Sequence, residues 1–439
     1  MVQQFSSTLR ITAICLFLAS ALVVRAQDKL SLSDCIQYAV SNNPQVRVAQ
    51  LQVNDAEWRI KESKATGLPQ FSGGVDIQRF IKQPGLPAEA LGFDAPPGTK
   101  ITFALKNSLA FNVQANQLLF SNSYLQALKA ARFYREYVSD QLAVAIRTVT
   151  NQVTDAYLPA LLITDNLGIL DKNITNLEKL LNDTKAITKA GFAEQLDVDR
   201  LELSLATLRN ERGNLLRQMD IVINALKFTM GKPIADKLEL KDNVDRLMQE
   251  FGTADLTTEI NYMNRPEYLT LLKGRDLSNI QVDIYKKAWL PTASAFVNYQ
   301  SSWQGNDKLF WIPQSLAGLS ISVPIWNGGG TTASKQRAIL AVQTIEVQKA
   351  QLESSFQLEL DNARKQFLNA QDRVGNQQKN LELAQRIYNT TQTKYKAGVG
   401  SSFELVSAEQ SLYTAQQALM QAQYDLLTAK SAIKRALGQ

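Results

Sequence analysis

Side chains able to carry acid–base, nucleophilic or metal chemistry are scarce in this sequence. The 439 residues include no histidine and only two cysteines, Cys15 and Cys35. Histidine is the commonest general base and transition-metal ligand, and two isolated cysteines do not form a zinc-type ligand set. The chain has no Gly-x-Ser-x-Gly nucleophile motif, and the glycine-rich run at 327–330 lacks the lysine of a phosphate-binding loop. We therefore predict no catalytic residue, no metal site, no cofactor and no enzymatic activity.

The N-terminus, residues 1–26, has the pattern of a secretory signal peptide. A positive charge at Arg10 precedes an almost unbroken apolar run over 11–24, and Ala26 closes a plausible cleavage site. No later stretch approaches the ~20 apolar residues of a membrane-spanning helix. An exported chain of this kind stays in the periplasm, leaves the cell, or enters the outer membrane as β-strands.

Charge and cysteine content narrow the possible partners. Lysine and arginine number 47 against 41 acidic residues, a formal charge of +6, which falls to +4 when Arg10 and Arg25 are removed (6 − 2). This balance is mild and no basic block is present, so nucleic acid is not an expected partner. Loss of Cys15 leaves Cys35 without an internal disulfide partner, and we expect Cys35 to be a small buried residue of the first helix.

The sequence carries an internal repeat. Pairs of proline or glycine landmarks in the first half recur in the second half with the same separations, which are 25 residues between the prolines and 40 residues between the glycines. The matching pairs are Pro44/Pro69 with Pro266/Pro291, and Gly191/Gly231 with Gly398/Gly438. We therefore predict two structural repeats, 27–255 and 256–439, each built as helix, β-hairpin, long helix and helix. A surplus in the first half is rich in proline and glycine at 82–98 and predicts a long exposed loop.

Four segments alternate apolar and polar residues with a period of two, as half-buried strands do. We place these strands at about 70–80, 102–120, 292–302 and 315–326. Stretches of this length with one apolar face are typical of transmembrane barrel strands. Four of the five tryptophans fall in or beside the second hairpin, which favours a lipid interface over a soluble core.

Long helical segments occupy about 121–230 and 327–437, and each reverses at a Lys-Ala-Gly turn, at Gly191 and at Gly398. Glycine takes the left-handed turn and lysine faces the negative end of the helix dipole. Faces rich in alanine and glutamine are too polar for burial on all sides, so these helices need coiled-coil partners. A soluble coiled-coil scaffold of the envelope shares this signature, but such a scaffold has no use for the hairpins.

Four membrane strands cannot close a barrel by themselves, because an open edge in hydrocarbon leaves backbone groups unpaired. Several copies of the chain must therefore pool their strands in the outer-membrane lipid. Two copies give eight strands and an interior filled by side chains, and three copies give twelve strands and a water-filled channel.

The doubled pattern, together with four motifs, resembles the TolC-like outer membrane efflux proteins. The motifs are "NQLLFSNS" (116–123), "KAGFAEQLDVDRLEL" (189–203), "VPIWNGGG" (323–330) and "YKAGVGSSFELVSAEQSL" (395–412). The resemblance runs from Leu30 to Leu437 and implies a mainly α fold with membrane β-strands. It implies a homotrimer whose shared twelve-stranded barrel continues as an α-helical tunnel into the periplasm.

In function, the resemblance implies the exit duct of a tripartite efflux or type I secretion system in the outer membrane. Its partners would be other copies of the chain, a periplasmic adaptor protein and an inner-membrane transporter. The sequence does not identify the cargo. The alternative from a different class remains the soluble envelope scaffold.

The resemblance also implies a gate at the helical turns. The aromatic three residues before the turn glycine is Tyr395, and the acidic positions six and nine residues beyond it are Glu404 and Ser407, the latter a departure from the family. Gly400 stands where those members have an arginine. Asp197 and Arg200 have the same offsets from the first turn. For Glu404 the alternative is a solvated acid near a helix N-terminus. The turns expected to dock the adaptor are Gly191, Gly398, Val399 and Gly400.

Overall fold

The structure, a computed structural model, describes residues 29–191, 194–252 and 256–439. The predicted signal peptide and Cys15 lie outside the described residues. The chain is mainly helical and divides into two compact units, each drawing on both halves of the sequence. Unit 1 comprises residues up to Ala49, Ala143–Arg265 and Glu353–Gln439, and unit 2 comprises Gln50–Leu142 and Pro266–Leu352.

One order of elements recurs in the two halves. The first half runs α3 (Pro44–Ala65), β2 (Gln70–Arg79), β5 (Asn107–Phe120), α4 (Asn122–Lys189) and α5 (Gln195–Met230). The second half runs α7 (Pro266–Lys286), β7 (Thr292–Gly305), β8 (Phe310–Ser322), α8 (Gly330–Lys396) and α9 (Ser402–Leu437). Pro44 and Pro266 each occupy the first position of a helix, where the missing N–H costs nothing.

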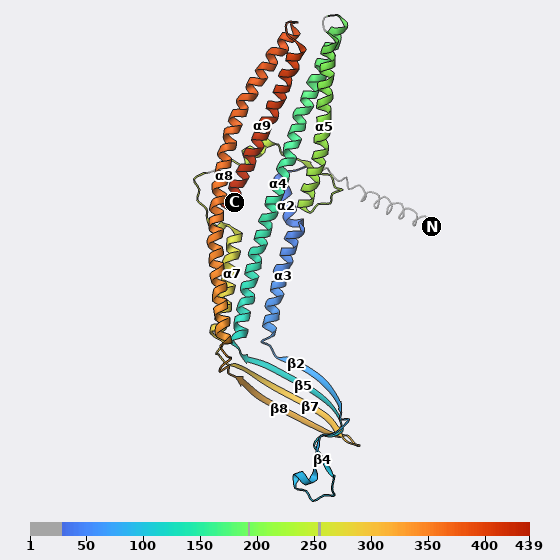
Figure 1. The fold of residues 1–439 in the computed structure, drawn as a ribbon, viewed down its shortest axis with the longest axis vertical. Coiled ribbons are helices and arrows are strands. Elements are labelled where there is room, and N and C mark those ends of the chain that lie inside the picture. The colour runs from blue at the N-terminus through green and yellow to red at the C-terminus, as the bar shows by residue number, and fades with distance from the viewer. Residues whose placement is uncertain (1–28, 192–193, 253–255) are drawn as a thin grey trace, which may run out of the picture. The chain divides into compact units, whose positions relative to one another are not determined.

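Unit 2 contains one antiparallel sheet of four strands in the order β2-β5-β7-β8 (Figure 1). The hairpin β2–β5 comes from the first half of the chain and β7–β8 from the second, and the pairing of β5 with β7 joins them. The outer strands β2 and β8 are each paired on one side in the described chain.

The strand boundaries differ from the sequence expectation at several places. Strand β5 begins at Asn107 instead of about 102, β7 continues to Gly305 instead of about 302, and β8 begins at Phe310 instead of about 315. The last strand was expected to reach residue 326, but β8 ends at Ser322, because Pro324 follows and has no N–H to donate to a ladder. The expected long loop at 82–98 is partly ordered: β3 (Gly85–Pro87) pairs with β4 (Lys100–Thr102), and the short helix η1 (Ala88–Leu91) lies between them.

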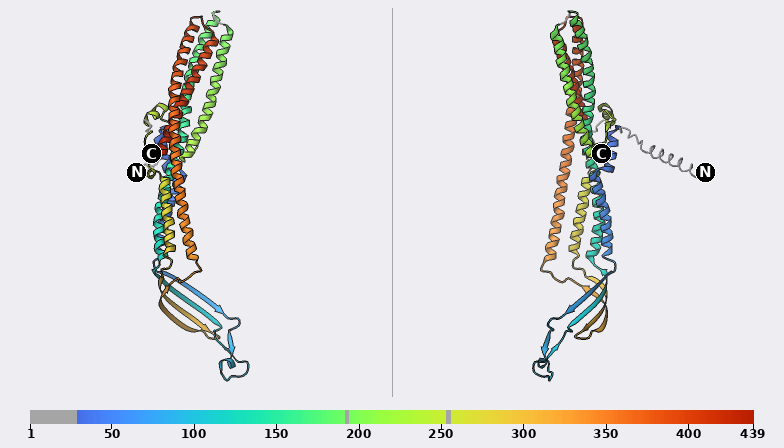
Figure 2. Two further views of the ribbon diagram at one scale, coloured as in Figure 1. Left: turned by 60° about the vertical axis from the view of Figure 1, so that its left-hand side comes forward. Right: turned by 90° about the vertical axis from the view of Figure 1, so that its right-hand side faces the viewer.

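Unit 1 contains the C-terminal parts of the long helices α4 and α8 and their antiparallel partners α5 and α9. Figure 2 shows α4 beside α5 and α8 beside α9. The reversals use glycines in the left-handed region, Gly191 with φ 82° and Gly398 with φ 74°, where a side chain would be strained. The C-terminal ends of α5 and α9 are likewise capped by Gly231 and Gly438.

Smaller elements complete unit 1. They are β1 (Lys29–Leu30), α2 (Leu32–Asn42), β6 (Glu239–Leu240), α6 (Val244–Glu250) and η2 (Tyr262–Asn264). Strands β1 and β6 pair in parallel, and the Asp242 carboxylate accepts hydrogen bonds from the Leu32 N–H (2.8 Å) and the Tyr157 hydroxyl (2.9 Å). Cys35 of α2 is fully buried, as expected, and burial raises the pKa of its thiol to about 12.

An apolar cluster of unit 1 joins three helices. Leucines of α4 and α5 pack together, and Leu405 and Tyr413 of α9 complete the cluster. Its buried members are Leu170, Ile174, Leu177, Leu180, Leu181, Val198, Leu201, Leu205, Leu208, Leu405 and Tyr413. The C-terminal hairpin is therefore anchored to the first hairpin through α9.

Candidate functional site: a two-faced sheet and the turns of two hairpins

The strand register gives the sheet of unit 2 one continuous apolar face. Residues directly opposite in a ladder point to the same side of a sheet, so Ile77, Leu109, Trp303 and Trp311 share one face across all four strands. The other apolar members of this face are Phe71, Val75, Phe111, Val113, Ala115, Ala295, Val297, Tyr299, Ala317, Leu319 and Ile321. We call this set the apolar face.

Nothing in the described chain covers the apolar face. Ile77 is 80% exposed, Phe71 is 77% exposed and Leu319 is 72% exposed. Each Å² of such surface left in water costs ~25 cal/mol, so a face this broad needs a cover. Its few polar groups are partnered, since the Trp311 indole N–H donates to the Ser301 hydroxyl at 2.7 Å. Arg79, the last residue of β2, is the one charged residue on this face in the four described strands.

The opposite face of the sheet is mostly amide and hydroxyl. Asn112 donates to Asp76 at 3.0 Å, and Gln304 donates to Ser302 at 3.1 Å. Asp76 is the one carboxylate in these four described strands. The remaining polar members are Gln70, Ser72, Gln78, Ser108, Gln114, Asn116, Ser294, Asn298, Gln300, Gln314, Ser320 and Ser322. A face of this composition is suited to water and to hydrated solutes.

The turns of the two helical hairpins in unit 1 touch each other through polar side chains. The Ser402 hydroxyl bonds to the Asp197 carboxylate and accepts a hydrogen bond from Arg200 at 3.3 Å. The Arg200 guanidinium also lies over the Phe403 ring, 5.7 Å from its centroid. Two of the predicted gate residues, Asp197 and Arg200, thus meet at Ser402, which the sequence analysis did not identify.

Tyr395 makes a second link between the hairpins. Its hydroxyl lies 3.1 Å from the Thr184 hydroxyl of α4. The turn after Tyr395 is tight, because a side chain at Gly400 would begin 3.0 Å from the Tyr395 backbone nitrogen. We call the contacts of Asp197, Arg200 and Ser402 with each other, and of Thr184 with Tyr395, the turn latch.

Glu404 and Ser407 lie elsewhere on α9 and do not join the turn latch. Both side chains are exposed in the first two turns of the helix. The Glu404 backbone N–H is capped by the Ser401 hydroxyl at 3.2 Å, and its carboxylate lies close to the positive end of the helix dipole. Neither side chain contacts the first hairpin through a hydrogen bond or ion pair of the described chain.

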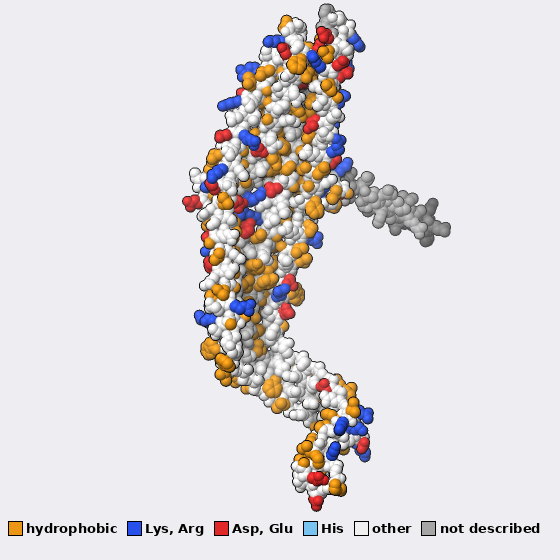
Figure 3. Space-filling view, viewed as in Figure 1, with side chains coloured by type: hydrophobic (Ala, Val, Ile, Leu, Met, Phe, Trp, Pro, Cys, Tyr) orange, Lys and Arg blue, Asp and Glu red, His pale blue; other side chains and the backbone are white. Residues whose placement is uncertain are grey.

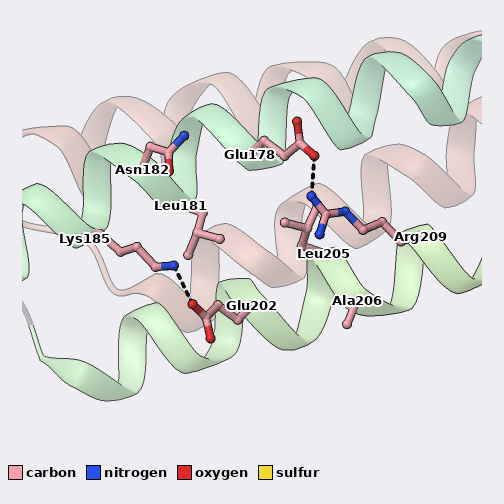
Figure 4. A pocket seen from close by; sticks show the side chains of 8 residues that line it. All are labelled: Glu178, Leu181, Asn182, Lys185, Glu202, Leu205, Ala206 and Arg209. Atoms are coloured by element: carbon pink, nitrogen blue, oxygen red, sulfur yellow. Dashed lines mark hydrogen bonds and ion pairs between the residues drawn. The ribbon is translucent and has the colours of Figure 1, made fainter.

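An open groove between α4 and α5 is bridged by charges. Figure 4 shows Lys185 paired with Glu202 at 2.6 Å and Arg209 paired with Glu178 at 2.7 Å, with Leu205 nearby. A further pair joins Arg212 to Asp171 at 2.6 Å. The charges of each pair neutralise one another.

Glu409 of α9 is a buried carboxyl that the sequence analysis missed. It is 8% exposed, and its Oε2 has no hydrogen-bond partner in the described chain. Burial raises its pKa to about 7, and burial together with the Glu409 carboxylate raises the pKa of Tyr388 on α8. The sequence does carry a signal for this burial. Glu409 lies one helical turn from Leu405 and one from Tyr413, on the same apolar face of α9.

The described residues contain neither a membrane-spanning helix nor a cluster of metal-binding side chains. None of their helices has both the length and the apolar character needed to cross a bilayer. Their histidine, cysteine and carboxylate side chains form no group of three that is close enough to hold a metal ion.

Comparisons with known proteins extend over both halves of the chain. A family model described as "Outer membrane efflux protein" matches residues 35–232 and 263–439. The chain is 22% identical over 414 residues to the pyoverdine export outer membrane protein OpmQ of Pseudomonas aeruginosa, covering 93% of this chain and 85% of that protein. It is 24% identical over 437 residues to the outer membrane protein TolC of Escherichia coli, covering 93% and 82%. The solved CmeC outer membrane channel of Campylobacter jejuni matches with a TM-score of 0.73 at 15% identity, covering 93% and 85%.

Proposed function

Because the chain belongs to the outer membrane efflux protein family, we propose that three copies form an exit duct through the outer membrane. Their twelve strands close a barrel, and the helical hairpins continue it as a tunnel in the periplasm. A periplasmic adaptor binds the turns at Gly191, Gly398, Val399 and Gly400, and an inner-membrane transporter supplies the cargo. Residues 1–26 are removed on export, and 27–255 and 256–439 act as the two repeats.

The two-faced sheet is the observation that carries this proposal. An uncovered apolar face backed by a polar face fits a wall between lipid and water. The edges of β2 and β8 are open in the described chain, and in hydrocarbon their unpaired backbone groups need a partner strand. Pairing β8 of one copy with β2 of the next supplies that partner, and three copies make a barrel wide enough for water.

The alternative, a soluble coiled-coil scaffold, accounts for the helices but leaves the apolar face in water. The match to the outer membrane efflux protein family and the similarity to OpmQ also do not favour the scaffold. The proposed duct gives both faces of the sheet a solvent that suits them.

Adjacent residues on one strand provide the test. Val297 lies on the apolar face and Asn298 on the polar face of β7. Lysine at mid-membrane on the lipid side of a barrel costs ~2–4 kcal/mol per copy, and lysine on the water side costs little. We expect Val297→Lys to abolish the detergent-extracted oligomer and Asn298→Lys to preserve it, as measured by light scattering after size-exclusion chromatography. Equal tolerance of both substitutions would contradict a lipid-facing role for the apolar face.

We also propose that the turns close the tunnel. The turn latch holds the second hairpin against the first, and exposed Glu404 and Ser407 face their copies around the threefold axis, where three carboxylates attract cations. Glu404→Ala should lower the cation-to-anion permeability ratio of the duct. An unchanged ratio would remove Glu404 from the constriction while leaving the duct itself in place.

A further inference from the structure

The loop end of the sheet gathers three separate chain segments into one structure. The Phe80 N–H donates to the Lys106 carbonyl at 2.9 Å, and the Lys106 N–H donates to the Asn306 side chain at 2.9 Å. Gln83 donates to the same Asn306 oxygen at 2.8 Å. Residues 79–83, 104–107 and 305–308 are thereby held together at the end of β2, β5 and β7 that carries the loops.

These segments carry an excess of positive charge. Arg79, Lys82, Lys106 and Lys308 form what we call the loop-end basic cluster, and Asp307 is the one acid in the same three segments. No ion pair of the described chain involves any of the four basic side chains, and only Lys106 is half-buried. Figure 3 shows lysine and arginine side chains gathered at this end of the sheet.

The loop-end basic cluster follows directly on the apolar face. Arg79 lies two residues beyond Ile77 on the same side of β2. Trp303 and Trp311 are paired across β7 and β8 at this end, and Phe111 meets Trp303 edge to face with ring centroids 6.0 Å apart. The order along the face is therefore apolar band, aromatic side chains and then positive charge. Aromatic side chains prefer the boundary between hydrocarbon and headgroups, so the charges that follow lie at headgroup level.

We infer that the loop-end basic cluster binds phosphate-bearing anionic lipid headgroups of the outer leaflet. This inference rests on the proposed duct, because the duct places the apolar face in lipid. Arginine and lysine are strong donors to phosphate oxygens, and four such side chains with a single neighbouring acid present a net positive surface.

The probe is diphosphoryl lipid A, added to the purified oligomer in neutral detergent, with the lipid retained through size-exclusion chromatography quantified by its phosphorus. The test variant carries Arg79→Gln, Lys82→Gln, Lys106→Gln and Lys308→Gln. A matched control with the same loss of four charges carries Lys172→Gln, Lys179→Gln, Lys237→Gln and Lys379→Gln, all exposed and without an ion pair in the described chain. A charge-conserving variant exchanges arginine and lysine at the four cluster positions.

We expect the wild type, the matched control and the charge-conserving variant to retain lipid A. Affinity in the test variant should fall on the order of tenfold to a hundredfold. Removal of one lipid phosphate or added salt should weaken retention by the wild type, and inorganic phosphate at equal concentration should not compete. Equal retention by the test variant and the matched control would overturn the inference, as would full competition by inorganic phosphate.

Two further readings keep this inference separate from the duct. Conductance in a neutral phosphatidylcholine bilayer is expected to persist in the test variant. A wild-type protein that conducts but retains no lipid A would contradict the headgroup site alone. A wild-type protein that never conducts would contradict the proposed duct. If the test variant does not assemble, the charge-conserving variant decides: retained lipid supports the cluster and lost lipid counts against it.

Discussion

The two helical hairpins of unit 1 have matching lengths but are held in different ways. Helices α5 and α9 each have 36 residues. The α4–α5 hairpin has its own leucine core and three interhelical ion pairs, at Asp171, Glu178 and Lys185 of α4. The α8–α9 hairpin also has an apolar core, which joins Phe367 of α8 to Ile433 of α9 and lies away from the turn. Arg373 pairs with Asp425, and no ion pair of the described chain joins the two helices between there and the turn.

Several contacts between the two hairpins are made through α9 of the second hairpin. Helix α9 buries Leu405 and Tyr413 against the leucines of the first hairpin, and Ser402 is bonded to Asp197 and Arg200 of α5. We propose that the first hairpin is the fixed element near the turns, because its core and its ion pairs lie close to them. The second is held to it by a small apolar contact, a polar latch and a contact that contains the buried Glu409. We propose that opening moves the second hairpin away from the first.

Removing apolar volume from the first hairpin should have the largest effect. Leu201→Ala deletes a fully buried side chain of the shared cluster and should lower the free energy of unfolding by ~2–5 kcal/mol. Leu203→Ala, at a position that is 71% exposed on the same helix, is the matched control and should change it by less than ~0.5 kcal/mol. The measurement is unfolding by denaturant, monitored by the circular dichroism of the helices. Equal losses would mean that the leucine cluster does not hold the hairpins.

The contact at Glu409 should weaken as pH rises. Burial raises the pKa of the Glu409 carboxyl in the folded state to about 7, above the ordinary glutamate pKa of 4.5, so the folded state favours the protonated form. Below pH 4.5 the carboxyl is neutral in both states and carries no penalty. Between pH 4.5 and about 7 the penalty grows, because ionisation in the unfolded state is easier, and above pH 7 it reaches about 3 kcal/mol.

Glu409→Gln should therefore remove this pH dependence and strengthen the contact at pH 8. The neighbouring titratable groups, Tyr388 of α8 and Tyr413 with Glu211 of α5 beside it, are unchanged in that variant. The readout is the rate of limited proteolysis at the turns at pH 5.5 and pH 8, with Glu382→Gln, at an exposed position of α8, as control. A wild type whose cleavage rate is the same at both values would exclude Glu409 as a titrating group of the contact.

Breaking the turn latch should have a smaller effect, confined to gating. Ser402→Ala removes partners from Asp197 and Arg200, and hydrogen bonds to charged groups contribute ~1.5–3 kcal/mol. The open-to-closed ratio of single channels should rise by about tenfold or more. Ser411→Ala, whose hydroxyl bonds only to its own helix at Ser407, is the control and should leave gating as it is. Identical open probabilities would remove the latch from the mechanism.

The smallest effect is expected in the groove between α4 and α5. Lys185→Gln breaks the exposed pair with Glu202, and such pairs contribute at most ~1 kcal/mol. The change in unfolding free energy should also shrink in 0.5 M salt, because salt screens exposed charges. A loss above ~2 kcal/mol would show that ion pairs, more than leucines, hold the first hairpin together.

Local chemistry explains what the sequence predicted well. Prolines and glycines set backbone angles directly, so the helix starts at Pro44 and Pro266 and the reversals at Gly191 and Gly398 could be placed before the structure was known. Alternation with a period of two likewise identified the hairpins. The end of β8 was wrong because the apolar pattern continues past Ser322, while Pro324 stops the ladder.

Contacts between distant segments could not be predicted in this way. Ser402 and Thr184 became visible as parts of the latch only once the two hairpins were placed against each other, since 205 residues separate Ser402 from Asp197 and 211 separate Thr184 from Tyr395. Glu409 has a local signal in its spacing from Leu405 and Tyr413, and these two neighbours pack against leucines from the other half of the chain. The roles of Glu404 and Ser407 depend on further copies of the chain and stay predictions.

The central claim, that copies of this chain form a duct through the outer membrane, is tested most directly by electrical recording. The wild-type protein is extracted from outer membranes in mild detergent and added to a planar lipid bilayer. The account predicts discrete, long-lived and cation-selective conductance steps from an oligomer with the mass of three chains. A protein that leaves membranes in plain buffer and never conducts would contradict it.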